Sequence, residues 1–509
     1  MMAETKREIE RKYEADDETE LPDLTRARGV SAVLDRGVAE LDAVYYDTPG
    51  LRLAADSLTL RRRTGGEDAG WHLKFPVATG IRDEIRAPLS DTLPRSLAGL
   101  LRSRVHDEPV VPVVRLRSSR DVRHLVDGDG TLLAEVSVDT VRAERLGEGG
   151  GATASWKEIE VELADGADPA LLDTVEKRLR KAGIHPSASP SKLARALEET
   201  TPGDAVPARP EQPAEDTAGA RVLAYVREQI DAIVTLDPAV RRDLPDSVHK
   251  MRVATRRLRS AFKTYRKVLD RTVTDPVGEE LKWLAGELGV ARDQEVLHAR
   301  LRGRLDELPP TLLLGPVHAR LRIWDVSRGV DARRTALAAL DSGRYLALLK
   351  ILDALLADPP LRKDARKAPA PVLARAVLKD YDRLADRVEQ ALALPAGHDR
   401  DIAMHQARKA AKQVRYAADA ATPTLGKPAK RFAKRIKTVQ TLLGDHQDSV
   451  VAREALRTLA IQAHAAGETA FTWGLLHGRE EAAGAAGERA FPDAWKWASA
   501  PKPRAALAR

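Results

Sequence analysis

Apolar and polar residues alternate in short segments throughout the first 200 residues. Successive side chains of a strand point to opposite faces, so a period of two predicts strands. The clearest such segments are 8–12, 58–63, 71–75, 114–117 and 157–163. From about residue 219 the apolar residues recur at spacings of three and four, which is typical of amphipathic helices. The pattern predicts an α+β multidomain chain, with a β domain followed by an all-α domain.

Charged residues of one sign gather on single faces of the predicted strands. Glu8, Glu10 and Lys12 share one face, and the later strands place basic or acidic residues in the same way. Like charges along a strand repel, so their stability cost needs an explanation. Basic and acidic strands that face each other across a lumen would explain it, with a metal and a polyanionic ligand neutralising both. A solvated strand would also show alternating Glu and Lys, and this simpler interpretation stays open for the first segment alone.

An ordered set of motifs resembles the CYTH family, the triphosphate tunnel metalloenzymes, over about residues 4–200. Glu8-Ile9-Glu10-Arg11-Lys12 fits the family's ExExK signature. The later matches follow in the family's order: Arg61 and Arg63, Lys74, Arg117, Asp139, the strand with Glu158, Glu160 and Glu162, and Lys192. The resemblance implies an antiparallel tunnel of about eight strands with flanking helices.

The same resemblance implies roles for these residues. Catalysis would fall to Glu8, Glu10 and Lys12, with the role of Lys12 open between contacting substrate and tuning a water. The phosphate-binding residues would be Arg61, Arg63, Lys74, Arg117 and Lys192. Mg²⁺ or Mn²⁺ would be held by Glu8, Glu10, Asp139 and two of Glu158, Glu160 and Glu162. Which two of these three glutamates take part stays open.

A Pro-rich segment separates the two predicted domains. Four prolines fall among Ala, Glu, Asp and Gly within residues 201–217, a composition that favours an extended linker. The predicted organisation is thus a tunnel domain at 1–200, a linker at 201–217, a helical domain at 218–490 and a basic tail at 491–509.

The helical domain carries a basic stripe that is repeated later in the chain. Five cations recur at helical spacing after His249: Arg252, Arg256, Arg259, Lys263 and Arg266. The segment from His405 to Arg415 repeats the pattern at an offset of 156, because 405 − 249 = 156. A Leu-Gly-x-x-x-Asp block at 288–293 recurs at 443–448 with an offset of 155, from 444 − 289. Two blocks shifted almost equally indicate an internal duplication.

These repeated blocks resemble the CHAD family, the conserved-histidine α-helical domain, over about residues 218–490. The resemblance implies a duplicated helical bundle that binds inorganic polyphosphate in a basic groove. The expected contacts are His249, Arg252, Arg256, Arg259, His405, Arg408, Lys412 and Arg415, with Lys434 and Lys437 as extensions. A structural role for the two histidines, or a merely solvated basic face, is the simpler alternative. Metal binding by these histidines is disfavoured because neither belongs to a His-x3-His pair.

The amino-acid composition limits the kinds of ligand and partner that we expect. The 509 residues carry a formal net charge of +7, which favours anionic ligands. Aromatic residues make up only 4% of the chain, too few for a stacking surface, so we expect no specific nucleic-acid ligand. There is no cysteine, no apolar run near the ~20 residues of a membrane span and no secretory signal. We expect a cytoplasmic protein without a membrane partner, for which association with polyphosphate granules is conceivable.

The sequence thus predicts a metal-dependent triphosphatase with an attached polyphosphate-binding domain. Candidate substrates are inorganic triphosphate, thiamine triphosphate and polyphosphate ends. A non-catalytic polyphosphate-binding protein is the main alternative, and an adenylate cyclase-type CYTH enzyme ranks below it.

Overall fold

The computed structural model of the protein describes residues 4–66, 68–147, 151–200 and 216–508. Two compact units make up the chain, Met1–Glu211 and Gln212–Arg509. Most of the predicted linker, residues 201–215, lies outside the described residues.

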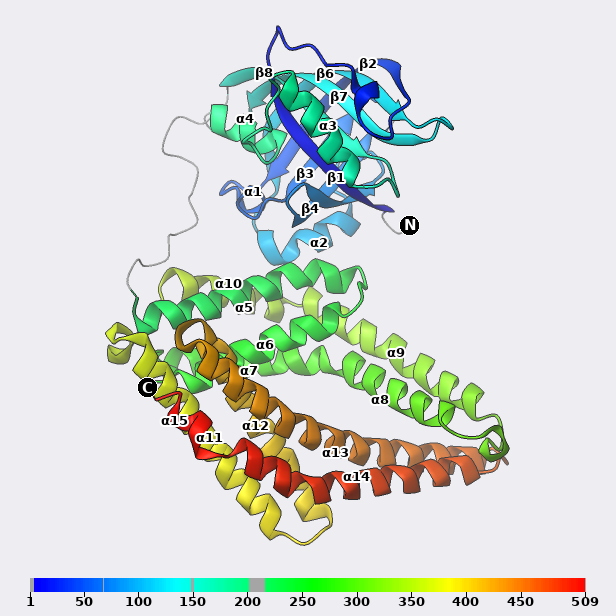
Figure 1. Ribbon diagram of the computed structural model, residues 1–509, viewed down its shortest axis with the longest axis vertical. Coiled ribbons are helices and arrows are strands. Elements are labelled where there is room, and N and C mark those ends of the chain that lie inside the picture. The colour runs from blue at the N-terminus through cyan, green and yellow to red at the C-terminus, as the bar shows by residue number, and fades with distance from the viewer. Residues whose placement is uncertain (1–3, 67, 148–150, 201–215, 509) are drawn as a thin grey trace. The chain divides into compact units, whose positions relative to one another are not determined.

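The first unit is a closed barrel of eight strands, all paired antiparallel, as the sequence predicted (Figure 1). The order around the barrel is β1-β5-β4-β3-β2-β6-β7-β8. Pairing of β1 with both β5 and β8 closes the sheet and leaves no edge. The strands are β1 (Glu4–Ala15), β2 (Ala32–Asp47), β3 (Thr59–Thr64), β4 (Gly70–Ala78), β5 (Ile81–Ala87), β6 (Val111–Val126), β7 (Leu132–Arg145) and β8 (Thr153–Leu163).

Four helices flank the barrel. They are α1 (Arg52–Ala55), α2 (Arg95–Val105), α3 (Ala170–Lys181) and α4 (Lys192–Thr200). Helix α3 packs its apolar face on Tyr13 and the outward face of β1, β7 and β8. Helix α4 instead joins a cluster with inward-facing residues of β2, β6, β7 and β8, including Tyr45 and Leu116. One end of the barrel interior is therefore filled with apolar side chains, and the polar residues are confined to the remainder.

The second unit is helical throughout its described residues, apart from an isolated bridge between Leu269 and Leu361. Its longer helices form antiparallel neighbours, and the pairs α8/α9 and α13/α14 project as long hairpins (Figure 1). The helices are α5 (Ala218–Arg241), α6 (Ser247–Thr264), α7 (Arg271–Glu287), α8 (Gly289–Asp306), α9 (Val317–Asp341), α10 (Gly343–Ala357), α11 (Pro369–Ala393), α12 (His398–Leu425), α13 (Lys427–Ala465), α14 (Phe471–Ala498) and α15 (Pro501–Ala505).

The stretch predicted as a separate basic tail is part of this helical unit. Residues 491–498 complete α14, and α15 follows at once. Phe491 and Leu507 are buried in the main helical core. The Arg504 guanidinium lies 4.7 Å from the ring centroid of Tyr381, so packing and a cation–π contact tie down a segment whose charge alone suggested a free end.

Candidate functional site

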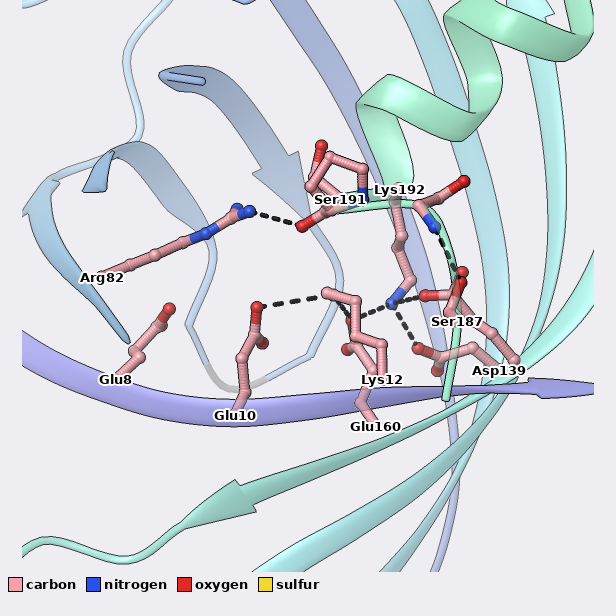
Figure 2. A network of polar contacts seen from close by, with 12 residues as sticks. Glu8, Glu10, Lys12, Arg82, Asp139, Glu160, Ser187, Ser191 and Lys192 are labelled. Atoms are coloured by element: carbon pink, nitrogen blue, oxygen red, sulfur yellow. Dashed lines mark hydrogen bonds and ion pairs between the residues drawn. The ribbon is translucent and has the colours of Figure 1, made fainter. Parts of the chain in front are cut away.

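The ExExK residues line the barrel interior in a row along β1. Glu8, Glu10 and Lys12 all point inward and are almost fully withdrawn from solvent (Figure 2). The Glu8 carboxylate accepts a 2.5 Å hydrogen bond from the Lys74 ammonium on β4. Lys12 lies 3.5 Å from Glu10 and also pairs with Glu160 on β8. The solvated-strand interpretation is thereby excluded, because these charges face a lumen.

A buried carboxylate cluster lies at the inner end of this row. Asp139 on β7 and Glu158 and Glu160 on β8 bring one oxygen each within 4.8 Å of one another. The ammonium of Lys192, at the N-terminus of α4, reaches all three at 2.8, 2.6 and 2.6 Å (Figure 2). Glu162 lies further along β8, where it accepts a 2.6 Å hydrogen bond from Lys6. All three alternating glutamates thus face the lumen, but only two belong to the cluster.

The cations inside the tunnel lower the pKa of Glu10, Asp139 and Glu160. Burial alone would raise the pKa of Glu160, but Lys12, Lys192 and Arg120 hold that pKa well below its ordinary value. Burial likewise opposes ionisation of Asp139, and Lys192 and Arg120 bring its pKa below the usual range. Glu8 is the exception, because burial raises its pKa above the ordinary value despite Lys74.

Arginines of β2, β3, β5 and β6 line the tunnel. Arg61 and Arg63 both line the cavity from β3. Burial, with repulsion from Arg61 and Arg120, lowers the pKa of Arg63 to about 9. Such mutual repulsion among cations is relieved when an anion binds between them.

The structure does not bring Arg117 into the tunnel, which corrects the assignment made by motif. Its side chain is 54% exposed on the outer face of β6, 3.9 Å from Asp42. Arg120 takes the interior place and makes 2.7 Å contacts with both Asp139 and Glu160. The face that carries Arg120 also carries Val114 and Leu116, which pack inside the barrel against α4. Arg117 alternates with these two apolar residues and therefore must point outward.

The lumen could hold a divalent cation and an anionic ligand together. Its cavity has a volume of about 470 Å³ and is lined by Lys, Arg, Asp and Glu side chains from the strands together with Lys192. The candidate metal ligands are carboxylate oxygens, the donor set that Mg²⁺ and Mn²⁺ prefer. The Lys192 ammonium among Asp139, Glu158 and Glu160 already occupies the position of a positive charge, which shows that this cluster accommodates a cation.

A second candidate site lies where α6 and α12 meet in the helical unit. Repulsion among Arg252, Arg256, Arg408 and Lys412 shows that the four cations gather there: burial, then Arg408 and Arg256, lower the pKa of Lys412 to about 7. Burial and the neighbouring Arg252 also lower the pKa of Arg256. Within the described residues, the buried Nε atoms of Arg252, Arg256 and Arg408 have no hydrogen-bond partner. We call these four cations the basic groove, after the groove that the sequence predicts, and their charge suits them to bind an anion.

Both halves of the duplication hold their first arginine in the same way. Arg252 contacts Asp293 at 3.1 Å, and Arg408 contacts Asp448 at 3.4 Å. A Cβ on Gly289 would come within 3.1 Å of the Arg252 guanidinium, and Gly444 lies 3.9 Å from that of Arg408 by the same measure. The repeated Leu-Gly-x-x-x-Asp block is therefore a cradle for the arginine, in which Asp orients the fork. In the first block Gly289 also leaves room for the guanidinium.

The remaining predicted groove residues are more dispersed. Arg259 lies 3.7 Å from Glu279 on α7, so this carboxylate partly neutralises the positive charge at this end of the stripe. Arg415 stacks on Tyr416, with its guanidinium 4.7 Å from the ring centroid. His249 and His405 are half-buried on α6 and α12, whereas Lys434 and Lys437 are exposed on α13. Arg259 also lines a cavity of about 360 Å³ together with Lys263 and Arg266, the next two cations of the stripe.

Family models match both parts of the chain. The CYTH domain model matches residues 6–197, and the CHAD domain model matches residues 224–457. The chain is a CYTH domain followed by a CHAD domain. Uncharacterized proteins from two strains of Mycobacterium tuberculosis are 41% identical over 487 residues, covering 93% of this chain and 92% of theirs. The aligned region therefore covers most of both domains.

Several solved structures match part of the chain. PptA from Streptomyces chartreusis is 25% identical, covering 55% of this chain and 99% of its own, with a TM-score of 0.47. The CHAD domain of the plant Ricinus communis is also 25% identical, covering 59% and 96%, with a TM-score of 0.40. A putative adenylyl cyclase from Hippeastrum, described as having a dominant triphosphatase activity, is 17% identical over 39% of this chain and 97% of its own, with a TM-score of 0.25.

The CYTH tunnel also contains an acid that the motifs did not single out. Glu84 on β5 is fully buried and contacts Lys74, Arg61, Arg86 and the His72 ring. Burial lowers the pKa of His72 to about 4, so this imidazole is neutral near pH 7. The alternation of Arg82, Glu84 and Arg86 along one strand face was the available signal. Among the described residues of both domains, no helix is long and apolar enough to cross a membrane.

Proposed function

We propose that the CYTH domain hydrolyses triphosphate-type substrates with a divalent metal and that the CHAD domain binds inorganic polyphosphate. The observation that carries the first part is the tunnel interior, in which arginines and lysines alternate with carboxylates around a cavity of about 470 Å³. A triphosphate places several negative charges in a row, and the tunnel offers cations along its length to receive them.

Cleavage of a phosphoanhydride requires neutralised phosphate oxygens, a positioned water and a stabilised leaving group. Arg61, Arg63 and Arg120 would bind phosphate oxygens, and Lys74 would add a further ammonium. The carboxylates of Glu8, Glu10, Asp139, Glu158 and Glu160 would hold Mg²⁺ or Mn²⁺. When bound, the ion would neutralise phosphate charge and lower the pKa of a water. Lys12 and Lys192 would keep the unligated carboxylates compensated until the ion and substrate arrive.

Phosphate release by the full-length chain tests this proposal. Tripolyphosphate, thiamine triphosphate, ATP and long-chain polyphosphate are compared with Mg²⁺ and with Mn²⁺, and with each metal chelated. We expect metal-dependent release from at least one of the first two, lost in Glu10→Gln with the barrel still folded. Cyclic AMP formed from ATP without free phosphate would favour the cyclase alternative. Absence of turnover on all four substrates would leave the tunnel as a binding site only.

The basic groove supports the polyphosphate part of the proposal. A polyphosphate chain has about one charge per phosphate, and its binding releases counterions as nucleic-acid binding does. The unpartnered Nε atoms of Arg252, Arg256 and Arg408 supply donors for such an anion. Binding would also remove the repulsion that lowers the pKa of Lys412.

Salt-dependent binding measurements test the groove. We expect long-chain polyphosphate to bind the full-length chain with an affinity that falls steeply with salt. Replacing Arg252, Arg256 and Arg408 with Ala should abolish most of the binding while tripolyphosphate turnover is retained. The exposed arginines Arg322, Arg457 and Arg479, which are not among the predicted contacts, are changed to Ala together as the charge-matched control. Equal losses in the two triple variants, or displacement by RNA at equal phosphate concentration, would contradict a specific polyphosphate groove.

A further inference from the structure

A histidine and two carboxylates meet where three helices of the CHAD domain's second half pack together. His446 lies in the middle of α13 and is only 3% exposed. Its Nε2 atom is 3.1 Å from Asp401 Oδ1 at the start of α12 and 3.1 Å from Glu488 Oε1 on α14. The three potential ligand atoms all lie within 4.8 Å of one another. Nothing in the triphosphatase or polyphosphate chemistry uses this cluster.

The second oxygen of each carboxylate is held by an arginine. Arg400 Nε lies 3.4 Å from Glu488 Oε2, and Arg453 Nη2 lies 3.5 Å from Asp401 Oδ2. These contacts turn Oε1 and Oδ1 toward the imidazole. They also place one arginine charge beside each of the two carboxylates. Such outer partners commonly orient the residues that bind a metal.

The separations are those of neighbouring ligands around a small divalent cation. Ligands about 2.0–2.1 Å from a metal are about 2.8–3.0 Å apart at octahedral angles and about 3.3–3.4 Å apart at tetrahedral angles. The two 3.1 Å separations from His446 lie between these two ranges. An ion could therefore bind His446 with either carboxylate at these separations, and the Asp401 and Glu488 oxygens lie within 4.8 Å of each other.

The cluster is not part of the duplicated anion-binding apparatus. The offsets of 155 and 156 place Ala291 and Pro245 where the second half has His446 and Asp401, since 446 − 155 = 291 and 401 − 156 = 245. Neither residue has a metal-binding side chain. The second half has thus acquired a feature that the first half lacks, although both retain the arginine cradle.

We propose that Asp401, His446 and Glu488 form a binding site for a divalent transition metal of the Zn²⁺ type. The imidazole is the reason for this class, because nitrogen ligands favour Zn²⁺ over Mg²⁺, whereas the all-oxygen set of the tunnel suits Mg²⁺ or Mn²⁺. Three protein ligands leave a fourth position for water or an anion.

The site lies next to the basic groove along α12 and α13. Asp401 lies one helical turn before His405, and His446 lies two residues before Asp448, which holds Arg408. A metal between Asp401 and His446 would fasten α12 to α13 next to this arginine cradle. The role assigned to the ion is therefore structural.

Zinc titration of the full-length, chelator-treated chain tests the site. Calorimetry in a large excess of Mg²⁺ suppresses binding to the tunnel carboxylates, and the wild-type chain is compared with His446→Ala and with His464→Ala. His464 is exposed on the same helix and is the matched control. We expect His446→Ala to bind one Zn²⁺ equivalent fewer than wild type and to lose the zinc-induced rise in thermal midpoint, with His464→Ala unchanged.

A second variant and a direct probe guard against misfolding of His446→Ala. Asp401→Asn is nearly isosteric and should weaken zinc binding at the same site with unchanged circular dichroism. Anomalous diffraction at the zinc edge should place a peak between the three side chains. Equal zinc stoichiometry in wild type, His446→Ala and Asp401→Asn, or an anomalous map with zinc only in the tunnel, would overturn the proposal and leave a proton shared by these residues.

Discussion

Replacing Lys192 with Met should destabilise the barrel and make its stability depend on divalent metal. The ammonium lies 2.6–2.8 Å from three buried carboxylates, and no other lysine reaches all three among the described residues. Removing one partner of a buried ion pair costs about 3–5 kcal/mol, because the remaining charge stays buried without compensation. Arg120 and Lys12 still contact this cluster, so we expect a loss of about 3 kcal/mol near pH 8.

The pH dependence follows from the carboxylates. In wild type, burial opposes ionisation of Asp139 and Glu160, but Lys192 and the other cations lower both pKa values. Their stabilising contribution is present above the unfolded pKa of about 4 and is lost as the pH falls through the folded values. Without Lys192 the folded pKa values rise, and the folded state takes up protons that the unfolded state does not. The deficit of the variant should therefore be largest at pH 8 and smaller near pH 5.

Hydrogen exchange resolved by peptide is the assay, because it reports on β1, β7 and β8 separately from the helical domain. Mg²⁺ or Mn²⁺ at about 100 times its dissociation constant should raise the free energy of unfolding of Lys192→Met by about 2.7 kcal/mol. Lys177→Met, on the exposed face of α3, is the control and should behave as wild type. Protection in Lys192→Met that is independent of both pH and metal would refute the electrostatic account of this cluster.

Two other predictions concern single cations. Arg120→Ala should lower tripolyphosphate turnover by at least 100-fold, measured as kcat/KM, since Arg120 faces the lumen, whereas Arg117→Ala on the outer face of the same strand should stay within a factor of about two; the reverse ranking would favour the motif alignment over the barrel geometry. Burial and nearby arginines lower the pKa of Lys412 to about 7 in the folded state, whereas its pKa in the unfolded state is about 10.5. Lys412 therefore destabilises the folded state below about pH 7, and this cost disappears as the pH rises toward 10.5. Polyphosphate should raise that pKa again, so calorimetry in buffers of different ionisation enthalpy should detect proton uptake near pH 8, and affinity should fall by up to roughly 30-fold between about pH 6.5 and 8.5. Lys412→Arg should remove this dependence, and an unchanged pH profile in that variant would contradict the assignment.

Much of the organisation was readable from the sequence because it depends on local periodicity. Side chains of any extended chain alternate between two faces. The sequence alone therefore predicts that Glu8, Glu10 and Lys12 share a face, whichever strands pair with β1. The nearly equal offsets of the two CHAD blocks likewise required no structure. Both family resemblances rested on such short patterns, and the family models match the same regions.

Only the closed barrel decided which face of each strand points inward. Arg117 and Arg120 both belong to one basic segment, and the choice between them depends on α4 filling one end of the lumen and drawing Leu116 to the inner face. Glu84 and the grouping of Glu158 and Glu160 with Asp139 depend in the same way on strands that are distant in sequence. The meeting of Asp401, His446 and Glu488 across three helices gave no local signal at all, because contacts between distant segments are set by packing rather than by spacing along the chain.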